Sequence, residues 1–323
     1  MAEAPRARVA VLISGAGTNM AALLYASRLD GCPYEIVVVG SNNPDAPGLR
    51  LAQAEGVPIF AHSHRGLSRE AHDALIDEEL NAAGAEFVAL AGYMRLLTPG
   101  FVGKWAGRML NVHPSLLPKY RGLDTHAQAL ANRDAHGGCS VHLVTEEVDA
   151  GEVLRQVPVA ILHGDTVERL AERVRLAEHQ LYPRVLAEFL SRPFDAAWIE
   201  AEVNRIASSL TEVTRKTSHG APGWAVGPDK TARLFAIIAD HHHGAETVGL
   251  LVKASGPDEM NGLIEAQPDI YYWPKYYGAS GWLGLKLNRR YVDWSQVEQW
   301  LERSWRSAAP ARLTRLMRAA EEF

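Results

Sequence analysis

The sequence predicts an α/β fold, in which a mostly parallel, doubly wound sheet is followed by a smaller α+β domain. Over the first 190 residues, short apolar runs alternate with helical patterns, which is typical of parallel strands joined by helices on both faces of a sheet. The length of 323 residues exceeds the usual size of one domain. We therefore expect a first domain over residues 1–193 and a second over residues 194–323.

The expected elements of the first domain follow from apolar runs and their flanking residues. Strands are expected at 8–13, 35–40, 57–60, 86–91 and 109–113, and helices at 19–28, 46–55, 68–83 and around 99–105. A further strand begins at Ser140 and runs into an acidic loop. In such folds, ligands bind beyond the carboxyl ends of the strands.

The second domain shows a different order of elements. A linker at 191–195 precedes an amphipathic helix at 196–210, and strands are expected at 231–239, 247–253, 270–273 and 282–287. A final helix is expected at 295–306, with Asp293 as its N-cap. This order predicts an α+β layout.

Charge and aromatic content differ between the two parts. Residues 1–200 carry 18 basic and 24 acidic side chains, whereas residues 201–323 carry 15 and 14 and hold six of the eight tryptophans. Such a change supports a boundary near residue 200. The net charge of −5 shows no overall basic character and argues against nucleic acid as the main partner.

The cysteines and the apolar runs indicate a cytoplasmic protein. Cys32 and Cys139 are too few for a disulfide framework and lack the spacing of metal ligands, so we expect no bound metal. The sequence has neither the pattern of a signal peptide nor an apolar run of roughly 20 residues, so we expect no association with a membrane. Oligomeric state, monomer or homodimer, is left open.

The most informative segment is residues 111–122, where a strand end meets a loop with two prolines. Asn111 and His113 lie two residues apart and therefore share one face of the strand, while Val112 can be buried. An amide that can bind a carbonyl oxygen, beside an imidazole that can transfer protons, suits acyl-group chemistry. A pair of satisfied polar residues at a strand end is the alternative.

A glycine turn at Ser14-Gly-Ala-Gly-Thr-Asn19 ends the first strand. Gly15 and Gly17 allow a tight turn and close approach to a ligand, and the following helix directs amide groups at an anion. We expect a phosphate site here. The third glycine of the dinucleotide fingerprint is missing at Met20, which argues against NAD, and a turn without a ligand is the alternative.

Asp149 is the carboxylate that we expect to pair with His113. A carboxylate beside an imidazole favours the protonated ring and fixes its orientation, so we expect it to raise the pKa of His113. Spacing alone allows the alternative that Asp149 is a solvated turn residue ahead of Gly151.

Together these elements resemble the phosphoribosylglycinamide formyltransferase family over about residues 8–190. The resemblance is carried by six segments, at 12–19, 90–97, 110–118, 138–142, 149–151 and 177–183. It implies the formyltransferase fold and a reaction in which the formyl group of 10-formyltetrahydrofolate passes to the amine of phosphoribosylglycinamide in purine synthesis. It also implies small-molecule substrates and no need for a metal.

The resemblance assigns roles to individual residues. The phosphoribosylglycinamide site is implied to contain Gly15, Gly17, Thr18, Asn19, Arg175 and Glu178, with Glu178 at the ribose. The formylfolate site is implied to contain Arg69, Met94, Arg95, Leu96, Leu97, Asn111, Thr145 and Val148. The implied catalytic residues are Asn111, His113 and Asp149. His142 matches a nearby histidine, which we interpret as a structural strand residue.

Related formylfolate enzymes share part of this pattern. A hydrolase or another formyltransferase would also carry Asn-x-His, the Ser-Leu-Leu-Pro loop and the remote Asp, so the glycine turn is what favours the glycinamide enzyme. Two residues depart from the family pattern, Arg121 in place of Pro and His72 in place of an aromatic. Both are expected on the surface of a loop or helix.

The second part resembles the MmcQ/YjbR-like family over roughly residues 200–310, which implies a compact CyaY-like fold without a settled activity. The resemblance rests on four aromatic and glycine segments, at 219–224, 276–278, 281–283 and 292–294. Its aromatic rings, with Lys275, Lys286, Arg289 and Arg290, could form a nucleic-acid surface. Packing in core and turns is the preferred interpretation, and His241 to His243 are interpreted as an exposed hairpin tip.

Overall fold

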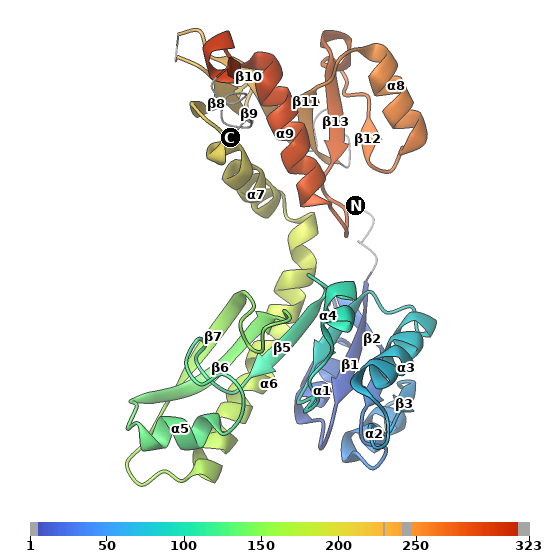
Figure 1. Cartoon of the computed structure of the whole chain (residues 1–323), viewed down its shortest axis with the longest axis vertical. Coiled ribbons are helices and arrows are strands. Elements are labelled where there is room, and N and C mark those ends of the chain that lie inside the picture. The colour runs from blue at the N-terminus through green and yellow to red at the C-terminus, as the bar shows by residue number, and fades with distance from the viewer. Residues whose placement is uncertain (1–5, 229, 241–246, 316–323) are drawn as a thin grey trace. The chain divides into compact units, whose positions relative to one another are not determined.

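The computed structural model describes residues 6–228, 230–240 and 247–315, so His241 to His243 lie outside the described residues. The chain divides into two compact units, the first ending at Leu190 and the second beginning at Ser191 (Figure 1). Each unit has its own sheet and its own core.

The first unit alternates strands and helices as the sequence predicts. Its elements, in chain order, are β1 (Ala7–Ile13), α1 (Thr18–Ala26), β2 (Tyr34–Ser41), α2 (Pro47–Ala54), β3 (Ile59–Ala61), α3 (Arg69–Ala82), β4 (Phe87–Leu90), α4 (Pro99–Lys104), β5 (Met109–His113), α5 (Thr125–Ala131), β6 (His136–Leu143), β7 (Val153–Ala160) and α6 (Val167–Ser191).

These strands form one seven-stranded sheet in the order β3-β2-β1-β4-β5-β6-β7. The pairs from β3 to β5 are parallel, whereas β6 and β7 are antiparallel to their neighbours. The prediction of a mostly parallel sheet is therefore confirmed. The switch at β5 places a direct cross-strand partner opposite Asn111 and opposite His113.

Alternate residues of β1 enter two cores on opposite faces of the sheet. Val9 and Val11 pack in a core with α1, α2 and α6, while Ala10 and Leu12 pack in a core with α3 and α4. Burial on both faces explains why β1 reads as a continuous apolar run rather than an alternating one.

The second unit begins with a 3-10 turn and continues as an α+β domain. Its elements are η1 (Arg192–Phe194), α7 (Ala196–Ser209), β8 (Val213–Ser218), β9 (Ala221–Val226), β10 (Arg233–Asp240), β11 (Val248–Lys253), α8 (Pro257–Ala266), β12 (Tyr271–Tyr272), η3 (Gly278–Ser280), β13 (Trp282–Lys286) and α9 (Trp294–Ala308). The strands form an antiparallel sheet in the order β12-β13-β11-β10-β9-β8.

Most aromatic rings of the second unit are part of its core or pack against it. Trp224 and Trp305 are fully buried, and Tyr271 packs against Trp300, whose indole nitrogen donates to the Tyr271 hydroxyl at 3.1 Å. The expected N-cap is present, because the Asp293 side chain accepts from the Ser295 and Gln296 amides. For these buried rings, the interpretation that the aromatic residues of the second domain pack in its core is therefore confirmed.

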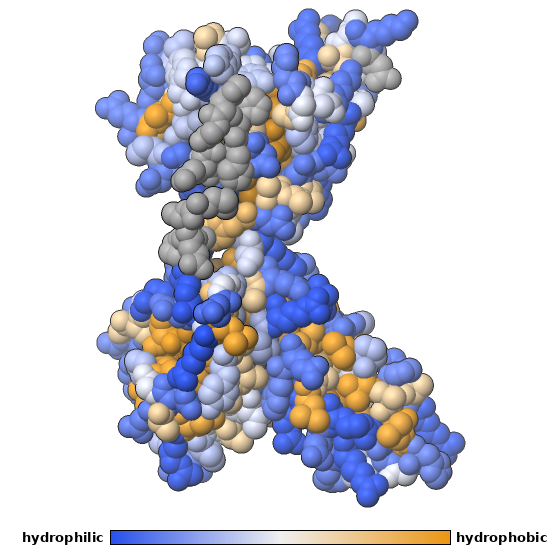
Figure 2. Space-filling view, turned by 180° about the vertical axis from the view of Figure 1, so that it is seen from behind, coloured by the Kyte–Doolittle hydropathy of each residue, from blue (hydrophilic) through white to orange (hydrophobic). Residues whose placement is uncertain are grey.

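None of the helices in the described ranges is both long and apolar enough to cross a bilayer. On the face shown in Figure 2, hydrophilic residues predominate in each unit and hydrophobic residues are interspersed among them.

Candidate functional site

Three neighbouring strands bring the predicted site segments together at one edge of the first sheet. Leu12 of β1 pairs with Leu90 of β4, and Leu90 pairs with Asn111 of β5. The glycine turn after β1, the segment after β4 and the end of β5 therefore lie in succession along the carboxyl edge, where ligands bind in this class of fold.

The tight turn depends on Gly17 and not on Gly15. Gly17 is in the left-handed region with φ 71°, and a Cβ there would lie 3.0 Å from the Cα of Gly48. Gly15 has no such φ and open space around it, so the turn geometry that we expected to require it does not. Gly17 caps α1 without a side-chain hydrogen bond, which leaves the amides of the first turn available to an anion.

Asn19 and Glu178 form a buried polar pair beside this turn. The Asn19 Nδ2 donates to Glu178 Oε2 at 2.7 Å, although the two residues are far apart in sequence. Burial raises the pKa of Glu178, while Asn19 and the charge of the exposed Arg175 oppose that rise. Asn19 Oδ1 is also buried and has no partner, so it is an acceptor available to a ligand hydroxyl.

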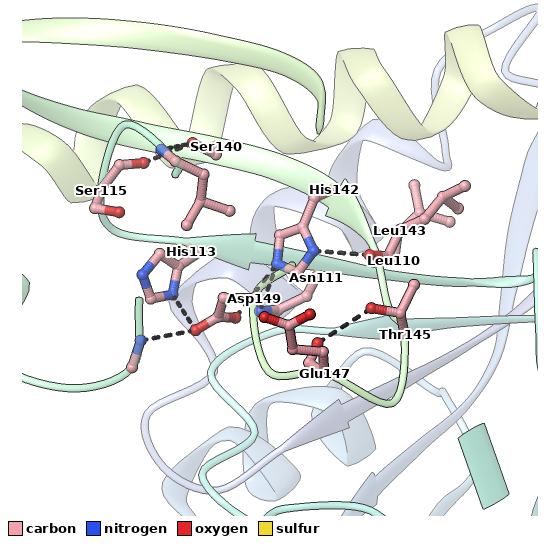
Figure 3. Close-up of polar contacts among 12 residues, drawn as sticks. Leu110, Asn111, His113, Ser115, Ser140, His142, Leu143, Thr145, Glu147 and Asp149 are labelled. Atoms are coloured by element: carbon pink, nitrogen blue, oxygen red, sulfur yellow. Dashed lines mark hydrogen bonds and ion pairs between the residues drawn. The ribbon is translucent and has the colours of Figure 1, made fainter. Parts of the chain in front are cut away.

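The imidazole of His113 and the carboxylate of Asp149 meet as the sequence predicts. His113 Nδ1 lies 3.2 Å from Asp149 Oδ2, and the same oxygen accepts from the Gly122 amide at 2.9 Å (Figure 3). His113 Nε2 lies 2.9 Å from the Tyr120 carbonyl oxygen. Both ring nitrogens thus face acceptors, and only the protonated ring can donate to both.

The pKa of His113 shifts opposite to our expectation. Burial lowers it, and this effect exceeds the raising by the Tyr120 carbonyl and by Asp149, while His142 adds to the lowering. We expected the effect of Asp149 on the pKa of His113 to exceed that of burial. That expectation was wrong, because the sequence does not show how deeply a side chain at a strand end is buried. The ring is therefore mostly neutral near pH 7 and can accept a proton.

Asp149 is held in a conformation that few residues adopt. Its φ is 49°, in the left-handed region that Asp tolerates better than most side chains. Two residues later, a Cβ on Gly151 would lie 1.9 Å from the Leu143 carbonyl oxygen, so this position requires glycine. Although burial opposes its ionisation, the contact with His142, the bond from the Gly122 amide and the charge of both imidazole rings together lower the pKa of Asp149.

His142 contacts two of the predicted catalytic residues. Its Nε2 lies 3.3 Å from Asn111 Nδ2 and 3.5 Å from Asp149 Oδ1, and its Nδ1 lies 2.8 Å from the Leu143 carbonyl (Figure 3). We interpreted His142 as a structural strand residue, and the structure adds contacts that interpretation omits. The sequence offered only a partial signal, because Ser140-Val-His142 repeats the spacing of Asn111-Val-His113. The antiparallel pairing that sets Asn111 opposite His142 is seen in the structure.

The predicted formylfolate residues are mostly exposed. Met94 is 68% exposed, Leu96 49% and Val148 47%, whereas Leu97 packs partly against the core. The other predicted members of this site are placed as follows: Arg69 is exposed at the start of α3, Arg95 is half-buried, Asn111 is half-buried on β5, and Thr145 is exposed in the acidic loop. Met94 and Leu96 lie in the segment after β4, and their exposed apolar side chains are available to a flat apolar ligand.

Of the two departures from the family pattern, one lies where we expected and one does not. Arg121 is exposed and pairs with Glu147 of the acidic loop at 2.5 Å. His72, expected on the surface, is fully buried on α3, where its Nε2 lies 3.0 Å from the His62 carbonyl oxygen. The amphipathic pattern of α3 did not show that this polar ring faces the core.

A cavity of about 260 Å³ is lined by residues of the loop after β5, of α5 and of the start of β6. Its lining includes Ser115, Tyr120, His126 and Asp134, and it includes neither the three predicted catalytic residues nor the glycine turn. Among the described residues, no group of His, Cys, Asp and Glu is arranged to hold a metal ion.

The histidines of the first unit predict a loss of stability in mild acid. Burial is the largest cause of the lowered pKa of His72, His113, His126 and His179, and burial favours the neutral ring. The unfolded chain, with histidine pKa values near ~6.5, therefore binds more protons than the folded chain as pH falls below that value. The stability that the first unit gains from burying neutral histidines is therefore fully present above pH ~6.5. It is lost as pH falls toward the lower pKa values of the folded state.

The pH dependence of this stability is measured by urea unfolding between pH ~5.5 and ~7.5, with hydrogen exchange of the β5 amides as the probe of the first unit. We expect the urea midpoint of the first unit to fall with acidification. A midpoint that is constant or rises would contradict the assigned burial effect.

Two family models match separate parts of the chain. The family model described as "Formyl transferase" matches residues 7–186, which is more than half of the chain. The chain belongs to the formyl transferase family. A second model, described as "YjbR", matches residues 208–307, so the chain combines a formyl transferase domain with a YjbR domain.

Individual relatives carry specific names. The chain is 46% identical over 182 residues to the "Trifunctional purine biosynthetic protein adenosine-3" of Bos taurus, covering 56% of this chain and 18% of that protein. It is 41% identical over 199 residues to the "Phosphoribosylglycinamide formyltransferase" of Escherichia coli (strain K12), covering 60% of this chain and 94% of the relative. The crystal structure of phosphoribosylglycinamide formyltransferase from Brucella melitensis superposes with a TM-score of 0.55 at 46% identity, covering 57% of this chain and 95% of that one.

Proposed function

We propose that this formyl transferase moves the formyl group of 10-formyltetrahydrofolate to the amine of phosphoribosylglycinamide. The observation that carries the proposal is the approach of His113 Nδ1 to Asp149 Oδ2 at 3.2 Å, next to Asn111 and at the same sheet edge as the glycine turn. The names of the relatives at 41% and 46% identity support the same substrates.

In the proposed reaction, the neutral amine of the glycinamide attacks the formyl carbon. The bond from the amine nitrogen to the formyl carbon forms, and negative charge develops on the formyl oxygen. Asn111 Nδ2 has two hydrogens, and one that His142 does not bind can donate to this oxygen. Donation that strengthens as charge develops lowers the barrier.

His113 then handles the proton that the amine loses. Its lowered pKa leaves the ring neutral and able to accept the proton, and Asp149 stabilises the charged ring once it forms. The bond between the formyl carbon and the folate nitrogen breaks as that nitrogen receives a proton, from His113 or through an ordered water. In the described conformation, His113 Nε2 is in contact with the Tyr120 carbonyl oxygen. Nε2 can therefore reach a substrate only after the contact between these two atoms is broken.

The phosphoribosyl group is proposed to bind at the glycine turn. The first turn of α1 receives no side-chain capping bond and has Thr18 exposed on it, so it suits the phosphate, and the exposed Arg175 supplies a positive charge. The buried pair of Asn19 and Glu178 suits the ribose hydroxyls, because a carboxylate and a free amide oxygen both accept. Gly15 has open space around it, which allows a ligand to approach its backbone closely.

The formyl donor is proposed to lie over the segment Met94–Leu97, with Arg69, Thr145 and Val148 at its border. The exposed Met94 and Leu96 offer apolar contacts to a flat ring, and Arg69 suits an acidic tail. This donor is a co-substrate, and the proposed transfer uses no metal and no covalent enzyme intermediate. The reaction is proposed to take place in the cytoplasm.

We propose that the YjbR domain is accessory to this transfer. Its exposed rings Trp273, Tyr276 and Tyr291 are a minority of its aromatic residues, and Lys286 Nζ donates to the Pro268 carbonyl oxygen at 2.9 Å. These features favour the interpretation that the rings pack within the domain, and they argue against a nucleic-acid surface.

The test is a steady-state assay of the full chain with both substrates, followed by absorbance of the folate product. We expect product only when the phosphoribosyl amine is present. Folate product that forms at the same rate without the amine would favour the hydrolase, and its absence under all conditions would overturn the proposal.

A further inference from the structure

We propose that Ser14 is a positioning residue for the formyl donor, because its hydroxyl holds the donor segment Met94–Leu97 in place. The inference rests on the proposed function. Ser14 lies in the glycine turn, and from its position in the sequence it would be assigned to the phosphate site. Its side chain instead contacts the segment after β4, where the Met94 amide donates to its hydroxyl.

The Ser14 hydroxyl both accepts and donates a hydrogen bond. Its Oγ accepts from the Met94 amide at 2.8 Å and donates to Asn42 Oδ1 at 2.6 Å. The Ser14 amide itself donates to the Gly92 carbonyl at 3.1 Å. One residue of the turn after β1 therefore makes two bonds to the segment after β4.

Asn42 fixes the orientation of that hydroxyl. It follows β2, is only 5% exposed, and its Nδ2 lies 3.3 Å from His64 Nδ1. His64 Nδ1 also lies 3.0 Å from the Asn42 carbonyl oxygen. Because Asn42 Oδ1 takes the hydroxyl hydrogen, the Ser14 lone pairs are directed to the Met94 amide.

The donor segment depends on such bonds because Leu97 alone among its apolar side chains packs against the core. Met94 and Leu96 project outward, at 68% and 49% exposure. The far end of the segment is fixed where the Thr98 amide donates to Asp73 Oδ2 at 2.7 Å, and the contact from Arg95 to the Ser68 carbonyl is long at 3.4 Å. Ser14 therefore fixes the beginning of the segment.

The phosphate turn has separate support and does not need the Ser14 hydroxyl. The Gly48 amide donates to the Gly15 carbonyl at 3.1 Å, and the Ala21 amide donates to the Gly17 carbonyl at 2.9 Å. Removal of the hydroxyl should consequently displace the donor segment and leave the turn in place.

The test compares Ser14→Ala with Ser14→Thr, which keeps a hydroxyl, and with Ser63→Ala, which alters an exposed serine of the loop after β3. For Ser14→Ala we expect the KM of the formyl donor to rise about 3- to 10-fold, the loss that corresponds to one hydrogen bond. The KM of the phosphoribosyl substrate should stay within about twofold. Ser14→Thr should restore most of the donor KM, and Ser63→Ala should match the wild type.

Hydrogen exchange of the Met94 amide, measured on the full chain without substrates, gives a readout independent of turnover. We expect faster exchange in Ser14→Ala and wild-type exchange in Ser63→Ala. If the wild type turns over while donor KM and Met94 exchange are unchanged in Ser14→Ala, or both KM values rise equally, this inference fails alone. If the wild type shows no turnover, the proposed function fails and this inference fails with it, whatever the exchange shows.

Discussion

His113→Ala is expected to lower kcat by about 10³-fold or more while the first unit stays folded, because it removes the group proposed to carry the amine proton. His113 is 5% exposed, and its ring makes two polar contacts, to Tyr120 and Asp149. Steady-state turnover with both substrates saturating measures the effect.

The matched control is His163→Ala, which removes an exposed histidine from the turn between β7 and α6. It should leave kcat unchanged. If His113→Ala retained more than about a tenth of wild-type kcat, His113 would not be the proton carrier, because positioned acid–base groups usually contribute ~10²–10⁴-fold.

Asp149→Asn is expected to lower kcat by about 10²- to 10³-fold, since it removes the charge that stabilises protonated His113. The neutral amide can still accept from the Gly122 amide, so the loop geometry should persist. Asp149 raises the pKa of His113 against the effect of burial, so its loss should lower that pKa further. The ionisation that His113 contributes to the pH–rate profile should therefore move to lower pH.

Glu152→Gln supplies the control, because it neutralises an exposed carboxylate that lies three residues further along the chain. Its pH–rate profile should match that of the wild type. If Asp149→Asn left the profile unmoved, the carboxylate would act on the fold of the loop and not on the imidazole.

Much of the first domain could be predicted because the strands of its parallel part are apolar and each strand before β5 is followed by a helical pattern, whereas α5 and α6 were not predicted. The segment at 109–113 was predicted with the bounds that the structure shows. Alternation on this strand placed Asn111 and His113 on one face, and the register of β4 and β5 brings them to the edge where we expected a ligand. The pairing of His113 with Asp149, over a distance of 36 positions, was expected from the chemistry of the two side chains, whereas spacing alone also allowed Asp149 to be a solvated turn residue.

What the sequence did not show depends on three-dimensional burial. The lowered pKa of His113 and the buried ring of His72 both follow from packing around the side chain, which a local pattern does not reveal. The edge strand β7 was given no bounds, since half of its residues are exposed and Pro158 interrupts its pattern. The contacts of His142 required the antiparallel register of β6 against β5.

In the proposed reaction, the formyl group passes directly to the amine of the phosphoribosyl substrate. The most direct measurement uses 10-formyltetrahydrofolate with an isotopically labelled formyl carbon and follows the label by mass spectrometry. We expect the label in an N-formylated phosphoribosylglycinamide, in a quantity equal to the folate released. Label recovered as formate, with the amine substrate unchanged, would show hydrolysis and rule out direct transfer to the amine.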